Sequence, residues 1–179
     1  MAGDLHIAIS RFSRMDAPTI AAVNGTAAGA GFSIVISADL VISAKSANFV
    51  MAYTNAGLSP DGSSTYFLPR RIGDRRAREL MLTNRVLSAD EALDWGLINK
   101  VVDGKDLAEI TKELANKFAN GPTLAYGKVK SLLNASFDNG LETQMELETR
   151  NISDMARSSD GKEGIQAFLN KRKPDFKGE

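Results

Sequence analysis

A glycine-rich turn decides the fold class of this chain: Asn24-Gly25-Thr26-Ala27-Ala28-Gly29-Ala30-Gly31, hereafter the glycine turn. A short, partly β-branched run, Thr19–Val23, precedes it and predicts a buried strand. Apolar residues follow it from Phe32 to Ile36 and predict a helix that starts at the glycines. Two further strands are expected at Asp39–Ser43 and Asn48–Met51. This alternation of strands and a helix predicts an α/β core.

Small residues at a strand-to-helix junction have a physical meaning of their own. They let a ligand approach the backbone closely, and the first N–H groups of a helix have no acceptor within that helix. Such a place attracts an anion or an oxygen that acquires negative charge. The glycine turn lacks the Lys-Ser/Thr of a phosphate-binding loop, and Ile34 stands where a dinucleotide fingerprint needs its third glycine. The alternative interpretation is tight packing of the helix on the strand.

Composition narrows the classes of function. The 179 residues carry 22 Lys+Arg and 22 Asp+Glu, so no basic excess points to nucleic acid. Cysteine is absent, which excludes disulfides, a thiol nucleophile and cysteine-ligated metals. His6 is the sole histidine, and its place in an amphipathic helix over residues 5–12 favours a structural role. The apolar run 17–44 contains Asn24 and Asp39, so we expect no membrane span, and without an export signal we expect a cytoplasmic protein.

The second half of the chain is predicted to be almost entirely helical. The run Ser88-Ala89-Asp90-Glu91 is a capping box, and Gly96 is placed to stop the helix that it begins. Apolar stripes then predict four helices, whose marker residues are Leu107 to Phe118, Val129 to Leu133, Leu141 to Met155, and Ile165 to Leu169. The sequence thus suggests a core over residues 1–120 and a helical C-terminal region over residues 121–179.

Several motifs in order resemble the crotonase family, the enoyl-CoA hydratases and isomerases. They are residues 17–25, the glycine turn, 38–42, 57–62, 68–70, 87–92, 95–98 and 163–172, so the resemblance covers essentially the whole chain. It implies an α/β spiral of strand–strand–helix units, followed by helices used for self-association into trimers or pairs of trimers. It also implies an acyl-CoA thioester substrate, with CoA as part of that substrate and no separate cofactor. We expect no metal, nucleic acid or membrane partner.

The resemblance assigns roles to individual residues. The family holds the thioester oxygen with two backbone N–H groups, and by position one of them is the N–H of Ala30, with Gly29 and Gly31 keeping the approach open. Members normally have a preceding segment that supplies the other N–H. We therefore expect a truncated chain with impaired activity, since one such donor contributes about 10²–10³ in rate.

The reaction is predicted from what stands at the family's catalytic positions. Hydratases of the family use two glutamates, and this chain has Ser33 and Tyr53 there, so a carboxylate pair that holds water is absent. Asp61 resembles the acid of isomerase branches, including the ring-epoxide isomerases of phenylacetate degradation. We therefore expect a double-bond isomerase in which Asp61 moves a proton. A Pro-Asp-Gly run is also typical of an ordinary turn.

The notable remaining assignments concern four residues: Tyr53, Tyr66, Lys171 and Phe168. Tyr53, together with Tyr66, is expected to shape the acyl pocket or to supply a hydroxyl; the alternative is an ordinary core residue. Lys171 is expected to contact CoA phosphates, with a solvated helix end as the alternative, and Phe168 is expected to form a wall of the site. Two alternative functions stay open: an enoyl-CoA hydratase with an unconventional base, and a non-catalytic subunit with the same fold.

Overall fold

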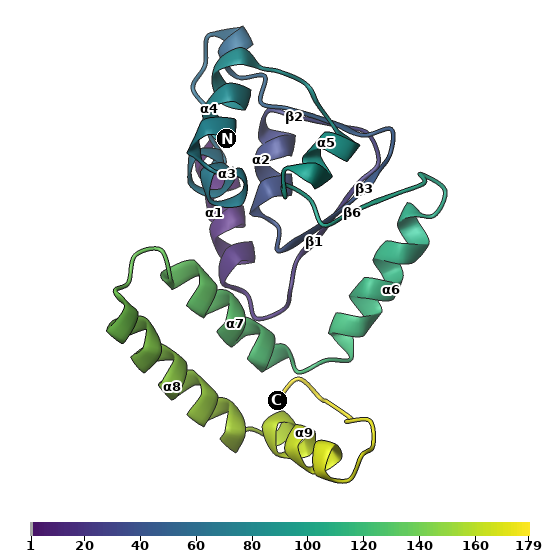
Figure 1. Cartoon of the computed structure of the whole chain (residues 1–179), viewed down its shortest axis with the longest axis vertical. Coiled ribbons are helices and arrows are strands. Elements are labelled where there is room, and N and C mark those ends of the chain that lie inside the picture. The colour runs from purple at the N-terminus through teal and green to yellow at the C-terminus, as the bar shows by residue number, and fades with distance from the viewer. Residues whose placement is uncertain (1) are drawn as a thin grey trace. The chain divides into compact units, whose positions relative to one another are not determined.

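The computed structural model describes residues 2–179 and divides the chain into two compact units. The first unit contains the residues up to 13 and residues 19–112, and the second contains residues 14–18 and 113–179. Helices α1 (Ala2–Arg14) and α6 (Leu107–Ala119) pass from one set of residues to the other. Figure 1 labels the elements along the chain. The predicted division after residue 120 stays a prediction.

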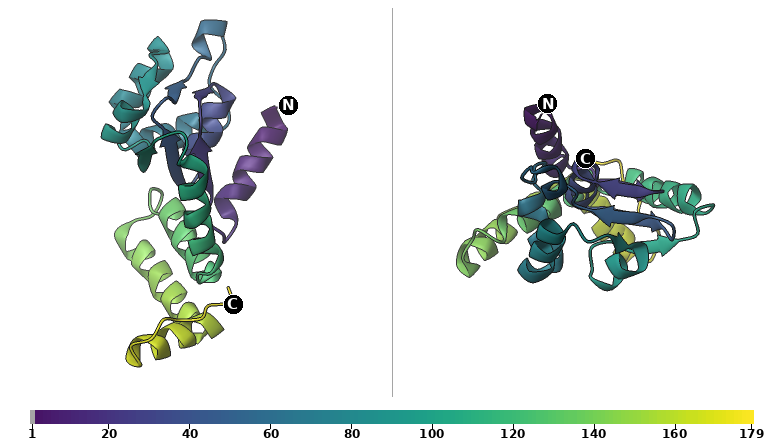
Figure 2. Two further views of the ribbon diagram at one scale, coloured as in Figure 1. Left: turned by 90° about the vertical axis from the view of Figure 1, so that its right-hand side faces the viewer. Right: turned by 90° about the horizontal axis from the view of Figure 1, so that it is seen from above.

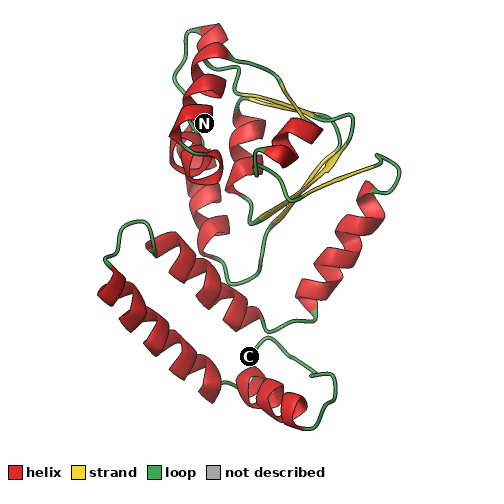
Figure 3. Ribbon diagram, viewed as in Figure 1, coloured by secondary structure: helices red, strands yellow, loops and turns green. Residues whose placement is uncertain are grey.

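Two small sheets form the framework of the first unit (Figure 3). The first has the order β1-β3-β6, and its strands β1 (Ile20–Val23), β3 (Leu40–Ala44) and β6 (Lys100–Val102) are parallel. The second has the order β2-β4-β5, with strands β2 (Thr26–Ala28), β4 (Asn48–Val50) and β5 (Leu87–Ser88). Strand β2 runs parallel to β4, and β5 runs antiparallel to it. Strands β1 and β2 are thus consecutive in the chain but belong to different sheets.

The helices of the first unit are short and pack on these sheets. They are α2 (Ala30–Ser37), α3 (Ser64–Ile72), α4 (Asp74–Thr83) and α5 (Ala89–Asp94), with a 3₁₀ turn η1 (Thr54–Ala56). Helix α2 contacts β2 and α3, and its Phe32 ring packs against Phe49 of β4 at 5.6 Å between centroids. Both rings are fully buried. The core thus holds the start of α2 firmly against the second sheet.

The second unit is helical and folds its own C-terminal tail back. Helices α7 (Thr123–Ala135) and α8 (Leu141–Arg157) lie side by side, and α8 contacts α9 (Ser159–Leu169) (Figures 1 and 2). Asp160 is 5% exposed, and its two carboxylate oxygens accept N–H bonds from Lys177 at 2.7 Å and Gly178 at 2.8 Å. One buried carboxylate therefore fastens the tail to the start of α9.

The main elements predicted from sequence are confirmed, and three strands were missed. Ser88 and Glu91 form the predicted capping box, and Gly96 has the left-handed φ of 74° that stops a helix. Strand β2 lies inside what the sequence suggested was only a turn, and strands β5 and β6 were not predicted. Each of these three has two or three residues and depends on partners far along the chain. None of the described helices is both long and apolar enough to cross a membrane.

Candidate functional site

The glycine turn leads from β2 into the first turn of α2. Gly29 is the N-cap residue, with φ 52° and ψ −123°, a conformation that strongly favours glycine. Its N–H donates to the carbonyl of Val50 at 3.1 Å, which ties the turn to β4. Ala30 and Gly31 follow as the first helical residues, and both are exposed. The start of α2 is thus accessible from outside, as an oxyanion-binding amide requires.

Asp61 lies directly beside this helix start, although 31 residues separate it from Ala30. The hydroxyl of Ser33, in the first turn of α2, lies 3.0 Å from the Asp61 carbonyl oxygen and 3.3 Å from that of Gly29. Ser33 is fully buried. The hydrogen bonds of one side chain therefore link the turn of Asp61 to the beginning of α2.

The close approach depends on the residue after Asp61. Gly62 has φ +61°, and a Cβ added to it would lie 2.6 Å from the Cβ of Ser33. The backbone of this turn therefore lies so close to α2 that a side chain at position 62 would not fit. The Gly62 N–H also donates to Nε2 of His6 at 3.1 Å. His6, which the sequence placed in a structural role, thereby helps to hold the turn of Asp61.

Tyr53 joins the same group of side chains. Its hydroxyl donates to Asp61 Oδ1 at 2.6 Å and lies 3.1 Å from the Ser33 hydroxyl. Burial of the ring raises the pKa of Tyr53 above its usual value, and the hydrogen bond to the Asp61 carboxylate raises it further. The phenol is thus a protonated hydrogen-bond donor near neutral pH. Ser33, Tyr53 and Asp61 form one connected cluster, hereafter the Asp61 cluster.

Sequence reasoning found these residues but not their contacts. It selected Ser33 and Tyr53 because neither is a carboxylate, and Asp61 because of a resemblance. The hydrogen bonds among them span 8 to 28 residues and left no local signal in the sequence. His6 lies 56 residues from its partner Gly62, which explains why its part in the site was missed.

The other predicted residues belong elsewhere in the fold. The Tyr66 ring is 37% exposed and stacks under the guanidinium of Arg70 at 3.7 Å. Phe168 and Lys171 belong to the second unit: Phe168, on α9, is 83% exposed, and Lys171 follows the helix with φ 52°. Their contacts with CoA stay predictions. Among residues 2–179, no group of three or more His, Asp or Glu side chains is arranged to hold a metal ion.

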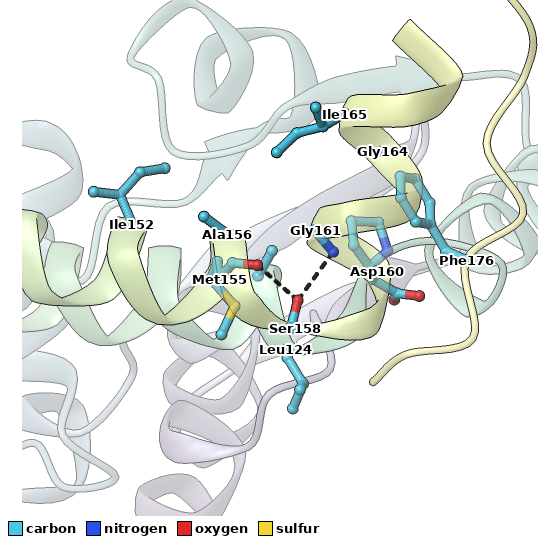
Figure 4. A pocket seen from close by; sticks show the side chains of 12 residues that line it. Leu124, Ile152, Met155, Ala156, Ser158, Asp160, Gly161, Gly164, Ile165 and Phe176 are labelled. Atoms are coloured by element: carbon cyan, nitrogen blue, oxygen red, sulfur yellow. Dashed lines mark hydrogen bonds between the residues drawn. The ribbon is translucent and has the colours of Figure 1, made fainter. Parts of the chain in front are cut away.

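The second unit contains an apolar cavity of about 290 Å³ (Figure 4). Its lining includes Leu124, Ile152, Met155, Ile165 and Phe176. Ser158 accepts a bond from the Gly161 N–H at 2.9 Å and donates to the Met155 carbonyl at 2.7 Å, so its hydroxyl caps α9. The carboxylate of Asp160, which also lines the cavity, is occupied by the tail. The polar groups here are therefore used in holding the helices and the tail.

Comparisons with known proteins show the family of this chain. The family model described as enoyl-CoA hydratase/isomerase matches residues 4–179. The chain is 44% identical over 170 residues to 1,2-epoxyphenylacetyl-CoA isomerase of Escherichia coli, covering 95% of this chain and 65% of that protein. It is 42% identical over 161 residues to a probable enoyl-CoA hydratase of Rhodobacter capsulatus, covering 90% and 63%. The chain therefore spans just under two thirds of the length of these two curated relatives.

Solved structures give the same result for the fold. The chain is similar to an enoyl-CoA hydratase from Polaromonas, with a TM-score of 0.93 and 36% identity over 98% of this chain and 68% of that one. It is equally similar to an enoyl-CoA hydratase from Bacillus anthracis, with a TM-score of 0.93 and 33% identity over 99% and 69%. The predicted crotonase-like α/β fold with a helical C-terminal region is confirmed, and the chain belongs to the enoyl-CoA hydratase/isomerase family.

Proposed function

We propose that the protein isomerises acyl-CoA thioesters, with Asp61 as the acid/base and the Ala30 N–H as a donor to the thioester oxygen. One observation carries the proposal: the Asp61 carboxylate accepts the Tyr53 hydroxyl, which in turn lies 3.1 Å from the hydroxyl of Ser33 in the first turn of α2. The positions at which the family's hydratases resemble one another in having glutamates hold a serine and a tyrosine here. Among the described residues of the Asp61 cluster, Asp61 is therefore the one carboxylate, and no second one is at hand there to activate water.

The reaction that fits one base is a proton transfer between carbons. Asp61 takes a proton from a carbon next to or conjugated with the thioester, and the C–H electron pair moves into an enolate. The enolate oxygen accepts a hydrogen bond from the Ala30 N–H. This lowers the barrier because the donor is already in place when the charge forms. Asp61 then returns the proton to another carbon. No water is consumed, and CoA takes part as a portion of the substrate without a further cofactor.

A relative's name supports the isomerase branch, and another keeps a second candidate open. The protein from Escherichia coli is named an isomerase, whereas the protein from Rhodobacter capsulatus is named a probable hydratase. A hydratase would add solvent oxygen to the product, and an isomerase would not. The two functions are therefore separated by the fate of water oxygen.

The test uses the 179-residue protein with a 3-enoyl-CoA and with crotonyl-CoA in ¹⁸O-labelled water. We expect the 3-enoyl-CoA to be converted into the conjugated 2-enoyl-CoA without ¹⁸O in the product. Asp61→Asn should lower that rate about 10²-fold or more, the usual contribution of acid/base catalysis. Asp94→Asn, on the exposed face of α5, is the matched control and should retain the rate. Incorporation of ¹⁸O would favour the hydratase, and no turnover by any form would favour a non-catalytic subunit.

We also propose that the C-terminal region mediates self-association into a trimer or a pair of trimers. The stripe predicted on α8 supports this, because Leu141, Met145 and Ile152 are 70%, 56% and 69% exposed. Exposed apolar side chains along one helix are typical of an interface. Light scattering of the protein and of an Ile152→Glu variant tests the proposal: the variant should dissociate.

A further inference from the structure

The two carboxylate oxygens of Asp61 have different surroundings. Oδ1 accepts the hydroxyl proton of Tyr53 at 2.6 Å, a distance typical of a bond to a charged acceptor. Within residues 2–179, no hydrogen bond or ion pair reaches Oδ2. Asp61 as a whole is half-buried, and a ligand at Oδ2 would displace no hydrogen bond of these residues. The side chain therefore has one oxygen held by the protein and one available for chemistry.

Counting protons decides the direction of these hydrogen bonds. Tyr53 and Ser33 have one hydroxyl proton each. An ionised carboxylate offers no proton, so the bond at Oδ1 takes the proton of Tyr53. The Ser33 proton is then shared among the Tyr53 oxygen at 3.1 Å and the carbonyl oxygens of Asp61 and Gly29. Every arrangement leaves Tyr53 as the donor to Asp61.

The phenol is itself held in place. The N–H of Tyr53 donates to the Met51 carbonyl at 2.8 Å, and its carbonyl accepts the N–H of Leu58 at 3.0 Å. Its ring packs against the buried core. A side chain fixed at its backbone and at its ring presents its hydroxyl in one direction, which is what positioning of a catalytic group requires.

We infer that Tyr53 is a positioning residue for Asp61: it holds Oδ1, so that Oδ2 is the oxygen that exchanges protons with the substrate carbon. The inference rests on the proposed function for its catalytic part. In the forward step the C–H bond breaks, an O–H bond forms at Oδ2, and the electron pair passes to the enolate; the return step reverses this at another carbon. Tyr53 keeps its proton throughout. Of the sequence-based expectations for Tyr53, this inference develops the supply of a hydroxyl and not the place in the acyl pocket.

The first measurement needs no turnover. Tyrosine labelled with ¹³C at Cζ reports ionisation of each phenol in an NMR titration. In Asp61→Asn the Tyr53 transition should move to lower pH by about one unit or more, because the neighbouring anion that opposes a phenolate is gone. The control is Tyr66→Phe, which should leave the Tyr53 transition where it was. An unmoved Tyr53 transition in Asp61→Asn overturns the inference, whatever the activity.

The second measurement is the pH dependence of kcat/KM for isomerisation by the wild type and by Tyr53→Phe. The phenylalanine keeps the ring and removes the donor to the carboxylate. The rising limb should therefore move to higher pH by about one unit or more. A role in packing alone would lower the rate at every pH without moving the limb, and that result would overturn the inference. If the wild type shows no turnover while the NMR transition moves, the proposed function fails and the hold of Tyr53 on Asp61 stands.

Discussion

Replacing Gly62 with alanine is the sharpest test of how the turn of Asp61 lies against α2. Two costs act at this position. The left-handed φ of +61° costs an alanine roughly 1–2 kcal/mol. The new Cβ would also lie 2.6 Å from the Cβ of Ser33, 3.2 Å from its Oγ and 3.3 Å from Cδ2 of Leu5. Overpacking of this kind costs about 1–3 kcal/mol. We therefore expect Gly62→Ala to lower the free energy of unfolding by roughly 2–5 kcal/mol.

The chain offers a matched control for the first of these costs. Gly57 has a similar φ of +69°, but a Cβ there would meet nothing within 4 Å. Gly57→Ala should therefore cost only the conformational part, roughly 1–2 kcal/mol. Urea unfolding followed by the fluorescence of Trp95, the single tryptophan of the chain, measures both variants. The difference between them is the energy of the collision with α2.

A double-mutant cycle assigns that difference to one contact. Ser33→Gly removes the atom that the new Cβ would strike, so adding Gly62→Ala to it should cost about 1 kcal/mol less than adding it to the wild type. Equal losses for Gly62→Ala and Gly57→Ala would refute the reasoning, since position 62 would then have room for a side chain. In that case the turn of Asp61 would not lie against the start of α2, and the site described above would be wrong.

Three further predictions concern single carboxylates and caps. Ser88→Ala removes the capping box formed with Glu91 and should lower the free energy of unfolding by about 1 kcal/mol; an unchanged urea midpoint would contradict the cap. The hydrogen bond from the Arg172 side chain, and next the one from the backbone N–H of Asp175, lower the pKa of Glu163 to about 2. The contribution of Glu163 to the free energy of unfolding should therefore be complete above pH 5 and be lost as the pH falls toward 2. Acid titration of Glu163→Gln should lack this loss of stability. Asp160→Asn should weaken the fastening of the tail by about 1–3 kcal/mol and speed hydrogen exchange at residues 177 and 178, and unaltered exchange there would disprove that role.

Local rules in the sequence predicted those elements whose cause is local. The capping box at Ser88 depends on residues three apart, and the stop at Gly96 depends on one backbone conformation. Strand β2 could not be predicted in this way, because Thr26–Ala28 is extended only through its pairing with Asn48–Val50. Three residues of alanine and threonine have no strong preference of their own. Pairing between distant segments, and not propensity, makes this part of the turn a strand.

The site divides along the same line. Asp61 was identified through a resemblance, since by local pattern Pro60-Asp61-Gly62 indicates a turn, and Asp61 does lie at a turn next to the left-handed Gly62. Asp61 is a candidate base because the folded chain places Ser33 and Tyr53 within hydrogen-bonding distance of it. Ser33 and Tyr53 could be identified from the sequence, because they stand where the family's hydratases have glutamates. Their hydrogen bonds could not, because they depend on how α2 and the turn pack.

The composition of the Asp61 cluster has a consequence for the proposed reaction. Two carboxylates placed this closely would repel each other, and one of them would hold a proton. Ser33 and Tyr53 are neutral donors, so the cluster contains one carboxylate and no such conflict. In the proposed reaction Asp61 takes a proton from carbon, and negative charge develops on the enolate oxygen at the start of α2, where the N–H groups of the first helical turn and the helix dipole favour it. The total charge of the site does not change during the step. A cluster of this kind therefore suits the movement of a proton from one carbon to another better than the capture of water, which needs a second base.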